Sequence, residues 1–385
     1  MNPLARQKLQ EWRDSARRTV AAVSAELASM SWRGPRARES LKAALSVMLA
    51  VALAKALGLD DLWWAAFSGY MVMRSSFDET FRRGVYRIAG TVLGAALGIG
   101  LALVMTNHSL WRIVWIFGFS AVTLYFALLS RYGYAWLFLG ITHVMVLAFA
   151  VQLPDSLLYF AKLRIADVAV GTAACVIVSA LFALAGGTRP RSFLQSLRGL
   201  IGTPVATRVI QAEPGVRRRL LQHVCEAALA MACVTALGYN FGMTSFTQAS
   251  ITVFAVMMLP ITDFSANRRG AVRRKLIHRC FGCLFGGVAG ILLLLLTGHV
   301  PLLWWLALAI GVWVGQHLQS SGPGIGYIGT QFCLGYLTAF VHDPHLAESY
   351  AVAAERFAGI LSGLLVLGVI LYLGSLLSAP KEQNE

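Results

Sequence analysis

Two arginines stand inside long apolar stretches of the sequence, 192 residues apart. Arg164 lies in the stretch 158–185, and Arg356 lies in the stretch 348–377. A charge placed deep in such a stretch is rare and usually faces a partner or a watery path. A guanidinium can hold a carboxylate through two parallel hydrogen bonds. The pair therefore predicts two symmetry-related positions that bind small organic anions.

Acidic and imidazole groups near these arginines are candidates for moving protons. Asp167 follows Arg164 by three residues, and Glu355 directly precedes Arg356. The alternative for both pairs is a structural ion pair that holds helix ends together. His143 lies in the middle of another apolar stretch without an obvious neighbour in the sequence, so it is a third proton candidate. Its alternative role is that of a packing histidine with satisfied hydrogen bonds.

The offset of 192 residues recurs in a second motif, which marks a tandem duplication of about 150 residues per repeat. The first copy contains Arg87, Gly90, Gly94 and Gly98, and the second contains Arg279, Gly282, Gly286 and Gly290. Small residues at every fourth position allow helices to approach closely, so each glycine ladder predicts a packing seam, and the duplication suggests that the two ladders meet. The arginines are predicted to help bind the anion. The alternative is that they snorkel to lipid headgroups.

The second apolar segment of each repeat is unusual. Residues 62–73 span only about 18 Å as a helix, against a bilayer core of about 30 Å. Trp63 and Trp64 open this segment and could stack on an aromatic solute, or could belong to the aromatic belt of a membrane protein. Its counterpart, 243–260, is longer and carries Gln248 among several hydroxyl side chains. Matching short or interrupted segments point to a transport path, and polar packing between helices is the alternative.

The composition indicates a membrane protein with many spans. The chain is 57% hydrophobic and 13% charged, and apolar runs long enough to cross a bilayer recur along it. We predict an all-α fold of about twelve transmembrane helices in two six-helix repeats. With the N-terminus inside, all but five of the 33 Lys and Arg lie on cytoplasmic segments, which predicts cytoplasmic N- and C-termini. Six spans per repeat give both repeats the same orientation, the parallel type of transporter repeat.

The predicted organisation has five parts. They are a basic amphipathic helix at 1–35, membrane repeats at 36–186 and 217–378, a cytoplasmic linker at 187–216 and a tail at 379–385. A basic amphipathic helix suits the surface of an anionic membrane, and a solvated arm that packs on the rest of the protein is the alternative.

The sequence contains no pattern that predicts an enzyme, a cofactor or a metal site. Walker, H-E-x-x-H and G-x-S-x-G motifs are missing. Cys280 and Cys283 form a C-x-x-C pair, but the first repeat has Ile88 and Thr91 at these positions, and no second pair completes a zinc site. The net charge of +15 follows the cytoplasmic segments, so it does not indicate nucleic-acid binding.

The chain resembles the fusaric-acid-resistance family, whose bacterial members include aromatic acid exporters of the inner membrane. The resemblance covers 36–186 and 217–378, and its best motif is the sequence R-I-A-G-T that begins at Arg87. The segments that place Arg164 and Arg356 ahead of Gly171 and Gly363 also look like the family pattern. The resemblance implies proton-linked efflux of aromatic carboxylates, with a periplasmic adaptor protein as a further partner. A related plant group, the aluminium-activated malate transporters, implies a passive anion channel instead.

These observations predict a multi-pass transporter of the bacterial inner membrane that exports small organic anions, with aromatic carboxylic acids as the expected cargo. The expected partners are the anion and the lipid bilayer. A passive organic-anion channel is the first alternative, and a proton gradient distinguishes the two. The second alternative is a membrane scaffold that recruits partners through its N-terminal helix.

Overall fold

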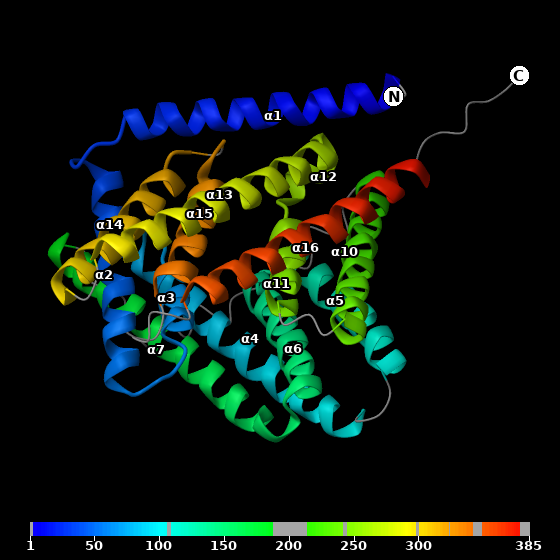
Figure 1. Ribbon diagram of the computed structural model, residues 1–385, viewed down its shortest axis with the longest axis horizontal. Coiled ribbons are helices and arrows are strands. Elements are labelled where there is room, and N and C mark those ends of the chain that lie inside the picture. Colours follow the sequence, from blue (N-terminus) through cyan, green and yellow to red (C-terminus); the bar gives the residue numbers. More distant parts are fainter. Residues whose placement is uncertain are drawn as a thin grey trace, which may run out of the picture. The chain divides into compact units, whose positions relative to one another are not determined.

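We analysed the protein as a computed structural model that describes residues 3–105, 109–187, 214–241, 245–297, 300–322, 324–341 and 349–377. These residues are almost entirely helical, and no strand occurs among them (Figure 1). The all-α fold predicted from the sequence is confirmed. The elements are α1 (Pro3–Ala28), α2 (Pro35–Ala56), α3 (Leu62–Met71), α4 (Phe77–Val104), α5 (Ser109–Leu129), α6 (Gly133–Gln152), η1 (Pro154–Ser156), α7 (Leu157–Ala185), α10 (Pro214–Phe241), α11 (Phe246–Met257), α12 (Ile261–Ala266), α13 (Arg268–Thr297), α14 (Pro301–Gln319), α15 (Gly326–Phe340) and α16 (Ser349–Leu377).

Eight candidate spans in the described part of the chain are long and apolar enough to cross a bilayer. They lie on α4, α5, α6, α7, α10, α13, α14 and α16. The prediction of a multi-pass membrane protein is therefore confirmed. The other four predicted spans also form helices, but α2 begins with several charged side chains, and α3, α11 and α15 have only 10, 12 and 15 residues. The number of twelve crossings stays a prediction.

The chain divides into two compact units that do not follow the two repeats of the sequence. The first unit comprises Met1–Ala89, Ala161–Thr203 and Arg269–Phe357, and the second comprises Gly90–Phe160, Pro204–Arg268 and Ala358–Glu385. Each unit therefore contains segments of both repeats. Of the predicted linker, 188–213 lies outside the described residues, as does the predicted tail 379–385.

Reciprocal helix packing explains why each unit contains parts of both repeats. In the first unit α2 packs on α14, and in the second unit α10 packs on α5. The first span of either repeat thus contacts the fourth span of the other. This exchange is the arrangement expected if a pseudo-two-fold axis relates the repeats.

Each glycine ladder packs against a helix of its own repeat. The ladder of α4 lies on α6, where a Cβ at Gly94 would meet the Leu139 carbonyl oxygen at 2.6 Å. The ladder of α13 lies on α15, where a Cβ at Gly286 would collide with the carbonyl group of Phe332. The predicted packing seams therefore exist, each within its own repeat, and the expectation that the two ladders meet stays a prediction.

Both segments predicted to be unusual are short helices. Helix α3 has 10 residues, about 15 Å, so it is too short to cross a bilayer core of about 30 Å. Helix α11 has 12 residues and ends before Met258, whose backbone is extended ahead of Pro260. Helix α11 is therefore the longer of the two, as expected, but it does not reach the predicted bounds 243–260. Proline restricts the preceding residues to extended conformations, which explains the early end.

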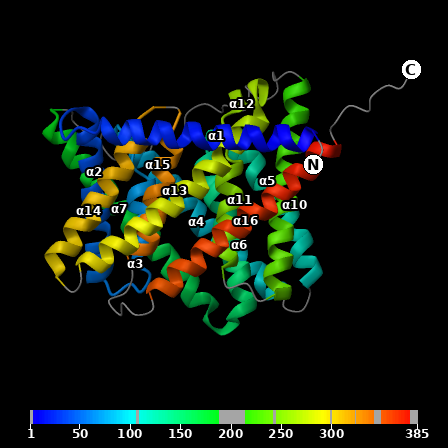
Figure 2. The same ribbon diagram turned by 45° about the horizontal axis from the view of Figure 1, so that its top comes forward.

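The N-terminal helix lies on the first unit. Helix α1 is one long, uninterrupted helix (Figure 2). It is joined to α13 by an ion pair between Glu11 and Arg273, and to the start of α2 by an ion pair between Glu26 and Arg36. Beyond its end, Trp32 stacks on Trp313 of α14 with ring centroids 4.3 Å apart. These contacts favour the alternative in which the arm packs on the rest of the protein.

Candidate functional site

The two arginines that violate the charge pattern meet at the start of helix α3. The Arg164 guanidinium of α7 lies 3.6 Å from the ring centroid of Trp64. The Arg356 guanidinium of α16 lies 3.9 Å from the ring centroid of Trp63. All four residues belong to the first unit. Arginines from both repeats therefore stack on neighbouring tryptophans of one short helix, an arrangement that cation–π attraction stabilises.

The tryptophans form a buried aromatic cluster with Phe67, one turn further along α3. The Trp63 and Trp64 ring centroids are 4.0 Å apart, and the Phe67 ring meets both rings edge-on. Trp63 and Trp64 are 7% and 6% exposed, so neither lies in an exposed aromatic belt within this unit. The buried indole nitrogen of Trp63 has no hydrogen-bond partner among the described residues, which leaves one donor available to a ligand.

Two carboxylates complete the charge of the site. Asp61 directly precedes α3 and interacts electrostatically with both Arg164 and Arg356. Asp167 is fully buried one turn after Arg164, and neither of its carboxylate oxygens has a hydrogen-bond partner within the described structure. A buried carboxyl group without hydrogen bonds is costly, so it usually has a functional reason. Glu355 is exposed on α16 beside Arg356.

Arg87 and Arg279 are buried and hydrogen-bonded within the first unit. Arg87 donates from Nε to the Ser68 hydroxyl oxygen at 3.2 Å, and Arg279 donates to the Gln331 side-chain oxygen at 2.6 Å. Each arginine is 2% exposed, so neither reaches outward as the snorkelling alternative requires. Arg87 is also an electrostatic neighbour of Arg164, so it extends the positive charge of the site along α3.

The two remaining predicted residues belong to the second unit. His143 accepts a hydrogen bond from the Trp115 indole nitrogen at 3.0 Å and packs on the Phe119 ring. Gln248 is 6% exposed on α11, where a Cβ at Gly359 would contact it. Eight of the ten predicted residues therefore lie in the first unit, and His143 and Gln248 lie in the second.

The structure adds three residues that the sequence did not single out. They are Asp61, Ser68 and Gln331, which contact or face the predicted arginines. Asp61 had a signal, because it lies two residues before the tryptophan pair. Ser68 and Gln331 had none, since their partners lie on other helices. No group of three or more metal-ligating side chains occurs in the described ranges.

The comparisons with known proteins bear on the part of the chain that carries most of this site. Residues 36–203 match the model of the fusaric acid resistance protein family. The family resemblance is confirmed over this segment, which contains Trp63, Trp64, Arg87, Arg164 and Asp167.

One similar relative is aluminum-activated malate transporter 10 of Arabidopsis thaliana. It is 27% identical over 127 residues, which cover 31% of this chain and 25% of the relative. The chain therefore spans only about a quarter of the length of that relative. No solved structure matches the chain.

Proposed function

We propose that the protein is an inner-membrane transporter that exports small organic anions, with aromatic carboxylic acids as its cargo. The stacking of Arg164 and Arg356 on the tryptophan pair of α3 carries this proposal. The match to the fusaric acid resistance family supports a transport role over an enzymatic one. The distribution of Lys and Arg supports a bacterial inner-membrane topology with both termini in the cytoplasm. A periplasmic adaptor is a further proposed partner.

The geometry suits an aromatic carboxylate in two ways. Stacking uses the flat face of a guanidinium, whereas its N–H donors lie in the plane and can hold a carboxylate by two hydrogen bonds. The neighbouring rings of Trp63, Trp64 and Phe67 offer apolar surface for the ring of the ligand. The unpartnered indole nitrogen of Trp63 supplies a further donor.

We assign proton coupling to Asp167 in the first place. Its carboxylate and the substrate carboxylate would compete for the positive charge of Arg164. A proton on Asp167 removes this competition, so the protonation state of Asp167 would control how tightly Arg164 holds the substrate. His143 and Glu355 are the secondary candidates, because His143 is already engaged by Trp115 and Glu355 is exposed.

Transport by reconstituted protein tests the anion site. We expect Arg164→Ala combined with Arg356→Ala to lower the flux of radiolabelled 4-hydroxybenzoate into proteoliposomes about 100-fold or more, because each charge-assisted contact contributes about 1.5–3 kcal/mol. Lys162→Ala is the matched control, since Lys162 is exposed two residues before Arg164 on the same helix. Unchanged flux in a folded double variant would exclude this site.

An imposed pH gradient tests the coupling. We expect Asp167→Asn to retain downhill flux and to lose the response to the gradient, because an amide cannot exchange the proton. Glu355→Gln and His143→Gln should keep the response. If wild-type flux ignores the pH gradient and follows only the electrochemical gradient of the anion, the protein is the passive channel that the malate transporter relative favours.

A further inference from the structure

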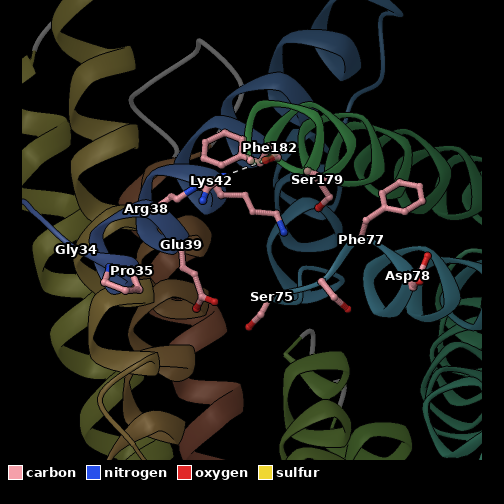
Figure 3. Close-up of a pocket in the computed structure, with 13 residues that line it drawn as sticks. Gly34, Pro35, Arg38, Glu39, Lys42, Ser75, Phe77, Asp78, Ser179 and Phe182 are labelled. Atoms are coloured by element: carbon pink, nitrogen blue, oxygen red, sulfur yellow. Dashed lines mark hydrogen bonds between the residues drawn. The ribbon is translucent and has the colours of Figure 1, made fainter. Parts of the chain in front are cut away.

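A cavity that carries charged side chains lies in the first unit, away from the arginine–tryptophan site. It has a volume of about 680 Å³ and is bordered by the start of α2, the start of α4 and the end of α7 (Figure 3). Its charged side chains are Arg38, Glu39, Lys42 and Asp78. A cavity of this size can hold a small organic molecule.

A buried lysine and a buried hydroxyl face this cavity. Lys42 is 5% exposed, and its ammonium group donates one hydrogen bond to the Arg74 carbonyl oxygen at 2.7 Å. An ammonium has three donors, so two more can serve a ligand. Ser179 is 2% exposed, and its hydroxyl lies beside the Cys175 thiol, a weak hydrogen-bonding group that leaves the hydroxyl able to bind a ligand. Figure 3 shows the Ser179 oxygen and the Lys42 nitrogen directed toward the same space.

The cavity and the arginine–tryptophan site lie at opposite ends of the same helices. Trp63 and Trp64 begin α3, whereas Arg74, the acceptor of the Lys42 hydrogen bond, follows its end. Arg164 lies near the start of α7, and Ser179 lies near its end. The buried Arg87 contacts α3 between these ends, at Ser68. Cationic groups therefore follow the length of α3 within the first unit.

We propose that this cavity is a second binding site for the cargo, which loads a small aromatic monocarboxylate from the cytoplasmic side. The proposal rests on the proposed function. Residues 34–42, 75–78 and 179–186 all belong to segments that the charge distribution places at the cytoplasmic ends of their helices. An anion bound here would be held by Lys42 and Ser179 before it reaches Arg87 and the arginine pair.

The balance of charge in the cavity selects a monoanion. Arg38 and Lys42 contribute two positive charges, and Glu39 and Asp78 contribute two negative charges. One carboxylate can pair with the buried ammonium, but a second negative charge on the ligand would face two protein carboxylates. Dianions such as malate should therefore bind more weakly here than benzoate.

Aromatic side chains give the cavity an apolar wall. Phe182 of α7 and Phe77 of α4 both border it. The Arg38 guanidinium donates a hydrogen bond of 3.0 Å to the Phe182 carbonyl oxygen and lies over the Phe182 ring, 5.9 Å from its centroid. An aromatic ring can pack on such side chains while its carboxylate reaches Lys42.

Equilibrium binding to the full-length protein in phosphatidylcholine nanodiscs tests this site. With radiolabelled benzoate we expect two molecules per wild-type chain, one per chain after Lys42→Met, and one per chain after Arg164→Ala combined with Arg356→Ala. Lys55→Met is the matched control, because Lys55 is exposed on the same helix, and it should leave two. Ser179→Leu, which copies Leu371 at the matching position of the second repeat, tests the site without removing a buried charge.

The outcomes separate this inference from the proposed function. A wild-type stoichiometry that neither Lys42→Met nor Ser179→Leu lowers would overturn the loading site. Retention of phosphatidylglycerol by wild-type protein but not by Lys42→Met, with no displacement by benzoate, would also overturn it and assign the cavity to a lipid headgroup. Loss of one benzoate on Lys42→Met, together with normal flux in the arginine double variant, would support the cavity and refute the arginine site.

Discussion

The same helix contact occurs once in each unit, but only one copy carries charge. In the first unit Gly171 of α7 packs on Ala65 and Ser68 of α3. In the second unit Gly363 of α16 packs on Ala249 and Thr252 of α11. The spacing along both short helices is identical, so the two contacts are equivalent positions of the repeats.

One turn away from this contact the two copies differ. Asp167 precedes Gly171 by four residues, whereas Gly359 precedes Gly363 by four. A Cβ at Gly359 would meet Ser245 and Gln248, which occupy the positions of Asp61 and Trp64. Carboxylates and tryptophan in the first copy are thus replaced by small or neutral side chains in the second.

This difference indicates that both repeats keep the same packing between two helices, whereas the charged and aromatic side chains occur in only one copy. Arg356 shows the same asymmetry, because it comes from the second repeat and stacks on Trp63 of the first. A single aromatic cluster with two cations results, in place of two symmetric sites. Experiments on matched positions can therefore separate framework from site.

The glycine contacts should give the largest effect, and an equal one in both copies. A Cβ at Gly171 would collide with the Ala65 carbonyl group, and a Cβ at Gly363 would meet Ala249 backbone atoms. We expect Gly171→Ala and Gly363→Ala each to destabilise the fold by about 1–3 kcal/mol or more, because backbone cannot yield cheaply. Thermal unfolding in detergent measures the loss.

Gly368→Ala on α16 is the control for this comparison, since a Cβ there meets nothing within 4 Å. It should not lower the unfolding temperature, because nothing collides with the new methyl group and Ala favours a helix more than Gly does. A large loss in only one of the two glycine variants would show that the two contacts are not equivalent.

The aromatic position should respond in one copy only. Trp64→Leu removes a ring that stacks on Arg164, and we expect the affinity for 4-hydroxybenzoate to fall about tenfold, since such a contact contributes about 1–2 kcal/mol. Gln248→Leu changes the matching position of the second copy and should alter the affinity less than about twofold. Competition binding with the radiolabelled acid measures both, and equal losses would mean that both copies bind the cargo.

The smallest effect concerns a second matched pair. His143 and Tyr336 hold equivalent places beside Gly94 and Gly286. His143 accepts from Trp115, whereas Tyr336 donates to the Ala307 carbonyl oxygen at 2.7 Å. We expect His143→Leu and Tyr336→Phe each to cost about 1 kcal/mol in stability, with flux at any pH unaltered. A changed pH profile after His143→Leu alone would restore this histidine as the coupling group.

The arginines could be found from the sequence because a charge in an apolar stretch is conspicuous without any structure. The pairing of Arg164 with Trp64 could not, since 100 residues separate them and no periodicity connects α3 with α7. The placement of Arg356 on Trp63 was even less accessible, because symmetry alone would assign it to the second repeat. His143 was selected for its isolation in the sequence, yet Trp115 from another helix donates a hydrogen bond to its Nε2.

Apolar length and spacing along the chain were enough to predict the helices, the duplication and the family resemblance, because all three are local features of the sequence. The sequence also determined which side chains are out of place in a membrane. Three features could be known only from the folded chain: α11 has just 12 residues, each glycine ladder packs on its own repeat, and both arginines share one aromatic cluster. These features depend on side chains from distant segments that compete for the same space, and no local pattern records the result of that competition.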